Sequence, residues 1–156
     1  MGPSPYEDPS FYKKLGVKPG YLILLSNVPA PFVDSILPNL PDGVKVQSQL
    51  EDGQRADIVV RWLSPEDQLP TLFAGLRWSI RPDGAVWVVI PKKKYAKKIG
   101  IDLTFEQAQS AALPTGLVDN KTLTFSEEYY GIRYVVRVVE RDRTRSGKEY
   151  KLSIEG

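Results

Sequence analysis

The chain has 156 residues, of which 42% are hydrophobic and 26% charged, and a formal net charge of +2 at pH 7. This length can bury a full core in one domain, and the composition is ordinary for a globular protein. No stretch approaches the roughly 18 consecutive apolar residues of a membrane span, so we expect no membrane association. With no secretory signal in view, a cytoplasmic location is the default prediction.

Two residue types are absent, and their absence excludes much enzyme chemistry. Without cysteine, the chain has no disulfide, no thiolate nucleophile and no cysteine-ligated metal. Without histidine, it has no imidazole base, no Ser-His-Asp triad and no histidine metal ligand. Any catalysis would rest on carboxylates, lysines, tyrosines or backbone dipoles. We therefore assign no catalytic residue and no metal ligand.

The first part of the chain alternates short helical and strand-like segments. Residues 1–10 are polar and rich in proline, and we expect an extended N-terminal arm there. A short helix at 11–15 should end at Gly16, because glycine accepts the left-handed conformation that ends helices. The elements expected next are a strand at 21–25 that is buried on both faces, a helix at 32–37, an edge strand at 44–46 and a strand at 57–62.

A helix start is expected at residues 64–67, which read Ser-Pro-Glu-Asp. Ser64 would be the N-cap and Pro65 the first helical residue, and the two acids would favour the helix dipole. The helix should turn one apolar stripe toward the core, made of Leu69, Leu72, Phe73, Leu76 and Ile80.

The next segment contains the most strand-like run of the chain. A Pro82-Asp83-Gly84 turn should lead into a strand at 85–90, and a lysine-rich loop at 91–100 should follow it. Thr104 should then cap a helix at 105–113. The tryptophans are expected to lie in the core: Trp62, Trp78 and Trp87.

The end of the predicted domain is a pair of strands at 117–125 and 132–139. The link between them is too short for a crossover helix, so they should form an antiparallel hairpin. The whole order predicts an α/β fold: a Rossmann-like, methyltransferase-type three-layer sandwich with a mainly parallel sheet and strand order 2-1-3-4-6-5. We expect one domain at 11–139, followed by a charged tail at 140–156.

The turn after the first strand is the most unusual feature. In nucleotide-binding α/β domains this turn is rich in glycine, so that backbone amides can approach a cofactor. Here residues 26–31 read Ser-Asn-Val-Pro-Ala-Pro, and no glycine lies between Tyr21 and Gly43. We therefore expect the usual cofactor turn to be closed. If the chain is nonetheless an enzyme, the side chains of Ser26 and Asn27 would replace the glycine contacts.

A group of lysines follows the fourth expected strand. Ligands of open α/β sheets bind outside the carboxyl ends of the strands, and this segment begins there. The group predicts an anion site for a phosphate, a nucleotide or a nucleic-acid backbone, with Tyr95 available for stacking. A solvated basic loop that keeps the sheet edge soluble is the alternative. The predicted anion-binding residues are Lys92, Lys93, Lys94, Lys97 and Lys98.

A second polar cluster, Asp119-Asn120-Lys121, opens the fifth expected strand. Asp119 and Lys121 would place a carboxylate and an ammonium near one crevice. A local role is favoured, in which Asn120 shapes a turn and Asp119 caps or pairs with a neighbour.

Several segments resemble class I methyltransferases that use S-adenosylmethionine, namely residues 15–20 (LGVKPG), 56–60 (ADIVV) and 80–87 (IRPDGAVW). Over roughly residues 12 to 138 the chain is also similar to a family of small bacterial proteins, a domain of unknown function. The residues that carry this second similarity are 15–20, 90–93 (IPKK), 102–104 (DLT) and 116–121 (GLVDNK).

The resemblance implies the Rossmann-like fold but no established activity. Two ligand elements of the methyltransferases are missing here. One is the glycine turn, and the other is an acidic residue that ends the second strand and holds a ribose; residues 44–49 read Val-Lys-Val-Gln-Ser-Gln instead.

Three functions remain open. The first is a non-catalytic module without a cofactor, which binds an anionic ligand or a protein partner; the net charge of +2 alone is too small to imply nucleic acid. The second is a divergent enzyme that depends on S-adenosylmethionine or a nucleotide. The third is a structural subunit that pairs with another protein through its C-terminal hairpin. The sequence leaves the ligand, the partner and the oligomeric state open.

Overall fold

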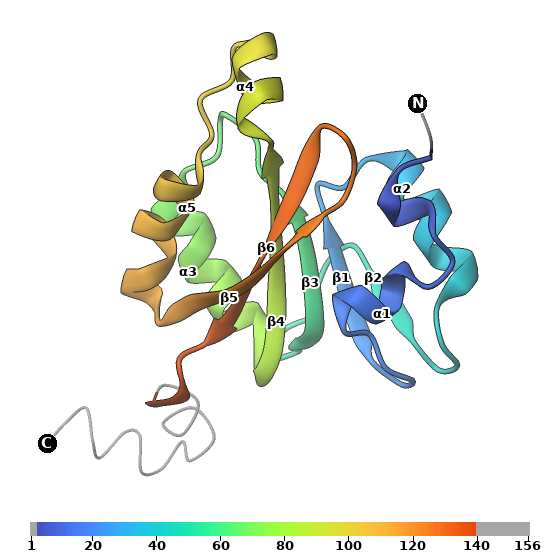
Figure 1. The fold of residues 1–156 in the computed structure, drawn as a ribbon. Coiled ribbons are helices and arrows are strands. Elements are labelled where there is room, and N and C mark those ends of the chain that lie inside the picture. The colour runs from blue at the N-terminus through green and yellow to red at the C-terminus, as the bar shows by residue number, and fades with distance from the viewer. Residues whose placement is uncertain (1–2, 140–156) are drawn as a thin grey trace, which may run out of the picture.

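The computed structural model describes residues 3–139 and builds them around a six-stranded sheet (Figure 1). The spatial order is β2-β1-β3-β4-β6-β5, which confirms the predicted topology. The first four strands are mutually parallel, whereas β6 runs antiparallel to β4 and to β5. The strands are β1 (Leu22–Ser26), β2 (Lys45–Gln47), β3 (Ala56–Trp62), β4 (Ile80–Pro91), β5 (Leu117–Thr124) and β6 (Tyr129–Val136). The charged tail predicted at 140–156 lies outside the described residues.

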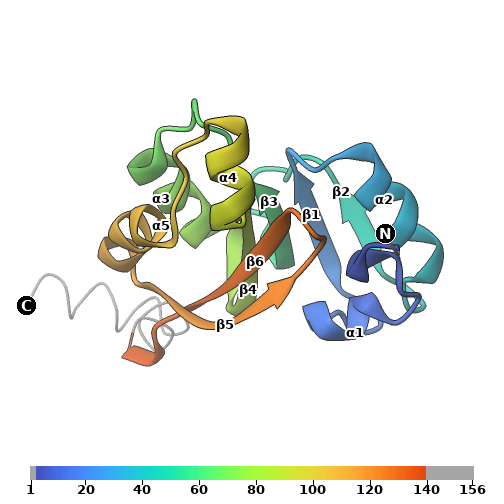
Figure 2. The ribbon, with the colours of Figure 1, turned by 45° about the horizontal axis from the view of Figure 1, so that its top comes forward.

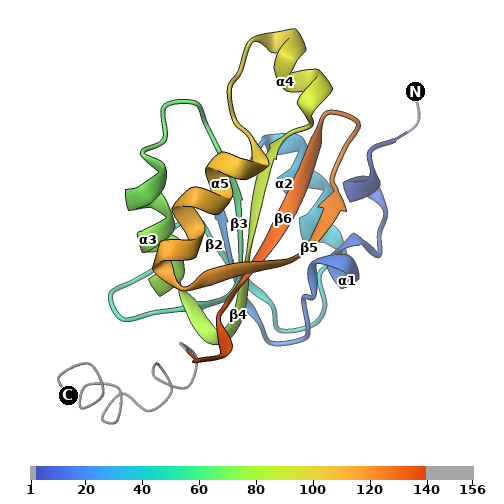
Figure 3. The ribbon, with the colours of Figure 1, turned by 60° about the vertical axis from the view of Figure 1, so that its left-hand side comes forward.

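Helices cover both faces of the sheet (Figures 2 and 3). One pair, α1 and α2, lies on one face, and α3 and α5 lie on the other, whereas α4 extends beyond the edge where β4 ends. Within residues 3–139, no helix is long and apolar enough to cross a membrane. The helices are α1 (Phe11–Leu15), α2 (Ala30–Ile36), α3 (Leu69–Ser79), α4 (Lys93–Ile99) and α5 (Phe105–Ala112), with short 3-10 turns η1 (Pro5–Glu7), η2 (Leu37–Asn39) and η3 (Leu113–Thr115).

The core has two halves, one on each face of the sheet, because successive strand residues point to opposite sides. In β4, for example, Val86 and Val88 pack under α3 and α5, whereas Trp87 packs on the α1 and α2 side. Trp87 is fully buried, and its indole N–H donates a hydrogen bond of 3.0 Å to the carbonyl oxygen of Leu15. The strands read as continuous apolar runs because both of their faces are covered.

The helix predicted from Ser64 begins later than expected, at Leu69, and that prediction is wrong. A helix that started at Ser64 would place Pro70 in its second turn, where the proline ring clashes with the preceding carbonyls. In α3 as observed, Pro70 lies in the first turn, where a missing N–H is tolerated. Residues 64–67 instead form a turn, closed by the Asp67 N–H and the Ser64 carbonyl oxygen at 3.0 Å.

The turn predicted at residues 82–84 is also wrong, because β4 continues through it with a shift of its register against β3. Ile80 pairs with Ala56 and Ala85 pairs with the residue two further along β3, so residues 81–84 all lie opposite Asp57. A Cβ atom on Gly84 would lie 2.7 Å from the carbonyl oxygen of Asp57. Glycine is therefore required here by the close approach of two strands.

Two further predictions differ from the structure. Residues 5–7 of the expected extended arm form η1, and the ring of Tyr6 packs edge-on against Phe32 at 5.4 Å between centroids. Trp62 and Trp87 are buried as predicted, but Trp78 is 47% exposed. Trp78 lies on the outer side of α3, two residues beyond Leu76 of the apolar stripe, and the guanidinium of Arg77 lies 4.2 Å from its ring centroid.

Candidate functional site

The carboxyl edge of the sheet brings the predicted site residues together. Strands β1, β3 and β4 are parallel, so they end at this edge, at Ser26, Trp62 and Pro91. The β5–β6 hairpin reaches the same edge, because Tyr129 at the start of β6 pairs with Pro91. The strand order reverses between β1 and β3, and this switch point is where open α/β sheets commonly hold a ligand.

A side chain of the turn after β1 forms hydrogen bonds across the switch point. Asn27 has a φ of 53°, and it is the only non-glycine residue with positive φ within residues 3–139. Its carboxamide nitrogen donates to the carbonyl oxygen of Trp62 and to Oγ of Ser64, each at 2.9 Å. Asn27 thus bridges the ends of β1 and β3, and Ser26 is half-buried opposite Arg61 in the sheet.

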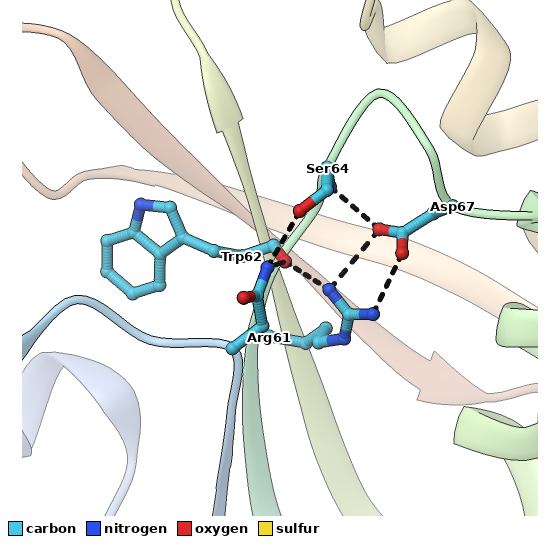
Figure 4. Close-up of polar contacts among 5 residues, drawn as sticks. Arg61, Trp62, Ser64 and Asp67 are labelled. Carbon is cyan, nitrogen blue, oxygen red and sulfur yellow. Dashed lines mark hydrogen bonds and ion pairs between the residues drawn. The ribbon is translucent and has the colours of Figure 1, made fainter.

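On the β3 side of the switch point, an ion pair joins Arg61 to Asp67 (Figure 4). Arg61 contacts Asp67 through two N–H groups, with Nη2 to Oδ1 at 3.0 Å and Nη1 to Oδ2 at 3.2 Å, and Nη1 also donates to the carbonyl oxygen of Trp62. Asp67 accepts a further bond of 2.7 Å from the backbone N–H of Ser64. The side chains of Arg61 and Asp67 are only 13% and 15% exposed. The polar groups at the switch point therefore satisfy one another.

Backbone donors are also scarce at this turn. Pro29 is the N-cap of α2 and Pro31 lies in its first turn, so neither residue has an N–H to offer. In a cofactor-binding domain, the same helix start would direct its amides at the ligand.

The end of β2 lacks an acidic side chain that could hold a ribose. Its last residue, Gln47, exchanges two side-chain hydrogen bonds with Gln54, at 2.9 Å and 3.0 Å. Gln47 also donates to the carbonyl oxygen of Gln49 at 2.8 Å. Both glutamine side chains are thus engaged within the chain.

The predicted lysine loop is a helix, α4, and its geometry points the lysines to two different sides. Gly100, in the left-handed conformation at φ 72°, ends the helix after Ile99. Lys94 and Lys98 lie one helical turn apart and face the hairpin turn, whereas Lys93 faces the opposite side. A helix therefore divides the predicted anion site in two.

The larger of the two resulting hollows, which we call the lysine hollow, lies between α4 and the β5–β6 turn. It has a volume of about 730 Å³. Within residues 3–139, no carboxylate lies within ion-pair distance of its lysines. The backbone N–H of Lys92 donates to the carbonyl oxygen of Glu128 at 2.8 Å, and Tyr95 packs edge-on against Tyr129. The lining residues are Lys92, Lys94, Tyr95, Lys97, Lys98, Glu127 and Glu128.

The smaller hollow, which we call the apolar hollow, lies on the other side of α4 and has a volume of about 430 Å³. Sequence reasoning missed it because its walls come from β4, α4, the connection to α5, α5 itself and β6. Sequence reasoning also missed Glu127 and Glu128 of the lysine hollow, although both lie in the predicted hairpin turn at the same edge of the sheet. The apolar hollow is lined by Ile90, Pro91, Lys93, Ala96, Lys97, Ile101, Leu103, Thr104, Phe105, Glu106 and Tyr130.

Asp119 and Lys121 do not meet in one crevice. The register of β5 shifts at Asn120, so Asp119 pairs with Tyr134 and Lys121 pairs with Arg133, on opposite faces of the sheet. Asp119 accepts a 2.8 Å hydrogen bond from Gln109 of α5, ten residues earlier, and Asn120 lies within β5 rather than in the predicted turn. The ammonium of Lys121 lies 6.0 Å from the centroid of the Trp87 ring, on the other face.

The Asp119 contact belongs to a chain of polar groups that links β5, α5 and β6. The hydroxyl of Tyr134 donates to Gln109 at 2.7 Å. Burial, and then the negative charge of Asp119, hold the pKa of the Tyr134 hydroxyl well above its usual value. This phenol therefore stays protonated as a buried donor.

No protein-family model and no curated protein sequence matches the chain. Solved structures match it over most of its length. The N-methyltransferase NodS of Bradyrhizobium japonicum, in complex with S-adenosyl-L-homocysteine, is 12% identical with a TM-score of 0.61, over 85% of this chain and 88% of that one. A SAM-dependent methyltransferase from Aquifex aeolicus is 12% identical with a TM-score of 0.58, over 83% and 89%.

A third match is the TehB-like SAM-dependent methyltransferase of Corynebacterium glutamicum, at 11% identity and a TM-score of 0.54, over 87% of this chain and 90% of that one. These likenesses confirm the distant resemblance and the fold: the chain has the Rossmann-like fold of class I SAM-dependent methyltransferases. At such identities they show the fold and not the activity. The similarity to the small bacterial family stays a prediction.

Proposed function

We propose that this protein is a non-catalytic binding module that holds an anionic group, of a ligand or of a protein partner, in the lysine hollow. It keeps a methyltransferase-type fold, but its binding site lies beside β4 rather than at the switch point. The observation that carries this proposal is the bridge from Asn27 to Trp62 and Ser64. That bridge occupies the place where a cofactor would need free donors.

The charge of the lysine hollow supports an anion as its ligand. Four lysines and two glutamates line it, so its formal charge is +4 − 2 = +2. Three of the lysines are exposed, so their ammonium groups are accessible to a ligand, and Lys92 is half-buried. Because the site is open to water, salt should screen its attraction for an anion strongly.

The test is a calorimetric titration with inorganic pyrophosphate. Binding should weaken severalfold between roughly 0.05 and 0.2 M salt. The double variant Lys94→Gln and Lys98→Gln should bind about tenfold more weakly, because it removes two ammonium groups from the hollow. The matched control, Lys13→Gln with Lys14→Gln, removes the same charge from the exposed side of α1 and should bind like the wild type. Equal binding by the two double variants would contradict the proposal.

A divergent SAM-dependent enzyme is the second candidate. The likeness of fold supports it at least as well as the first proposal, and Asn27 keeps a left-handed backbone conformation of the kind that glycine adopts readily. In this case Ser26 and Asn27 would contact the cofactor, and the Asn27 amide would exchange its bonds to Trp62 and Ser64 for bonds to the ligand. Such an enzyme should bind S-adenosylmethionine as purified protein and lose that binding when Ser26 or Asn27 is replaced by a bulky residue.

The structural-subunit hypothesis gains little support from the hairpin. Within the described residues β5 is an edge strand, but the bulge at Asn120 and the exposed Lys121 and Thr122 interrupt it. Bulges and lysines are features that hinder strand addition at a sheet edge.

A further inference from the structure

We propose that the apolar hollow binds a small ligand with a flat apolar body and one carboxylate group. This inference goes beyond the proposed function, because it concerns a different hollow with different walls and a different ligand. Helix α4 forms the partition between the two. Lys93 and Ala96 face the apolar hollow, Lys94 and Lys98 face the lysine hollow, and Lys97 borders both.

The walls of the apolar hollow suit an apolar body. Ile90 and Pro91, at the end of β4, are buried, and so are Ala96 of α4 and Leu103 of the connection to α5. Ile101 and Phe105 are partly buried and pack against the same core cluster. A volume of about 430 Å³ lies within the range of pockets for small molecules.

The polar groups of the hollow suit a single negative charge. Lys93 and Lys97 are exposed at its border, and Glu106 lies on the α5 side, so the formal charge is +2 − 1 = +1. A monocarboxylate matches this balance, whereas a phosphate dianion matches the lysine hollow better. Tyr130 adds a hydroxyl donor: burial, and then the charge of Glu106, raise the pKa of this phenol, so it stays protonated near neutral pH.

The start of α5 does not itself serve as the anion site. Thr104 already caps this helix, its Oγ accepting from the backbone N–H of Gln107 at 3.1 Å. Gln107 returns a contact of 3.3 Å, in which its Oε1 accepts from the Thr104 N–H. The ligand charge is therefore assigned to the lysines of α4, and the helix start is only a wall.

The experiment uses the full chain and a matched pair of probes, 2-naphthoate and its uncharged isostere 2-naphthamide, titrated by calorimetry and by amide chemical shifts. We expect 2-naphthoate to shift the amides of Ile101, Thr104 and Glu106, and to bind about fivefold or more tightly than the amide. Shifts confined to other parts of the chain would overturn the proposal. So would equal binding of the two probes, or binding of neither.

Three variants assign the site. Lys93→Gln should weaken 2-naphthoate binding about fivefold and leave 2-naphthamide unchanged. Ala96→Leu should block both probes, because the larger side chain fills the hollow. Lys94→Gln, on the other side of α4, should bind 2-naphthoate like the wild type. If Ala96→Leu does not fold, the comparison of Lys93→Gln with Lys94→Gln still decides, since both side chains are exposed.

The two proposals can fail separately. Pyrophosphate binding in the lysine hollow should depend on Lys94 and Lys98 and be unaffected by Lys93→Gln. Lys97→Gln should weaken both pyrophosphate and 2-naphthoate, because this residue borders both hollows. Loss of 2-naphthoate binding in Lys94→Gln but not in Lys93→Gln would contradict the assignment of the apolar hollow.

Discussion

Two ends of the same sheet edge differ in how their polar groups are used. At the switch point, Asn27, Arg61 and Asp67 are bonded to one another or to neighbouring backbone. Beside β4, the lysines of α4 have no carboxylate within ion-pair distance in the described part of the chain, and two hollows flank them. We therefore expect the first end to contribute to stability, and our proposals place ligand binding at the second.

This difference shows that a fold can be kept while the side chains at its usual ligand site differ. A likeness to methyltransferases over most of the chain fixes where strands and helices lie. It does not fix which side chains fill the edge of the sheet. In this chain, side chains at the usual position form hydrogen bonds with one another and with the backbone, whereas the lysines of α4 lie beside the β5–β6 hairpin.

The largest expected effect is a loss of stability when a core residue at the switch point is removed. Trp62 is 7% exposed and packs against Phe32 and Phe125, with ring centroids at 5.1 Å and 5.5 Å. Trp62→Ala should lower the free energy of unfolding by about 3–5 kcal/mol in urea titrations, because it leaves a large cavity. The exposed Lys98→Ala, at the other end of the edge, should change it by less than about 0.5 kcal/mol. Similar losses in the two variants would contradict the comparison.

The next effect concerns the ion pair at the closed end. Asp67→Ala should lower stability by about 1–3 kcal/mol, since it removes the carboxylate that pairs with the largely buried guanidinium of Arg61 and the acceptor of the Ser64 N–H. The neighbouring Glu66→Ala is the control, because Glu66 is exposed. Coupling between Asp67→Ala and Arg61→Ala in a double-mutant cycle should be favourable. Additive losses would show that the pair does not act as a unit.

Both ends of the edge could be anticipated in part from the sequence. The missing glycines in residues 26–31 predicted a closed turn, but the partners of Asn27 lie 35 and 37 residues further along the chain. The strand order followed from apolar runs and from the short link before β6. Two predictions from local sequence were wrong. Pro70 moves the start of α3 to Leu69, and Gly84 lies against Asp57 in the sheet and not in a turn.

For the lysines, the sequence predicted their position at the sheet edge but not their secondary structure. Their position after β4 predicted a basic edge, but residues 91–100 were predicted as a loop, whereas the structure has α4 there. The helix turns Lys93 away from Lys94 and Lys98, and this sorting cannot be read from a run of like residues. The bulge at Asn120 likewise separates Asp119 from Lys121, because one extra residue moves the second side chain to the other face.

A buried network within the sheet, where Tyr134 of β6 pairs with Val86 of β4, provides a pH test of the core. The pKa of Tyr134 is raised in the folded protein, so its contribution to stability is complete below about pH 10, the unfolded value, and is lost as the pH rises toward the folded value. Above about pH 10, the wild type should lose up to about 1.4 kcal/mol per pH unit more than Tyr134→Phe. Parallel pH profiles of unfolding for the two proteins would refute this role.

The smallest expected loss of stability comes from removing the hydrogen bonds of Asn27. Asn27→Gly should cost only about 0.5–1.5 kcal/mol, because glycine accepts the positive φ while two hydrogen bonds are lost. Asn27→Ala should cost more than Asn27→Gly, since alanine in the left-handed region adds strain. Thermal unfolding of the two variants measures the order, and the reverse order would mean that the backbone at this turn is not constrained as described.

The central claim is that the switch point is closed and that ligands bind beside β4. The most direct measurement is calorimetric unfolding of the wild-type protein with and without saturating S-adenosylmethionine. A ligand at about a hundred times its dissociation constant stabilises the folded state by roughly 2.7 kcal/mol, which raises the midpoint by several degrees in a domain of this size. Our account predicts no shift. A rise of several degrees would contradict it and identify the protein as one that binds this cofactor, with Ser26 and Asn27 as the first residues to test.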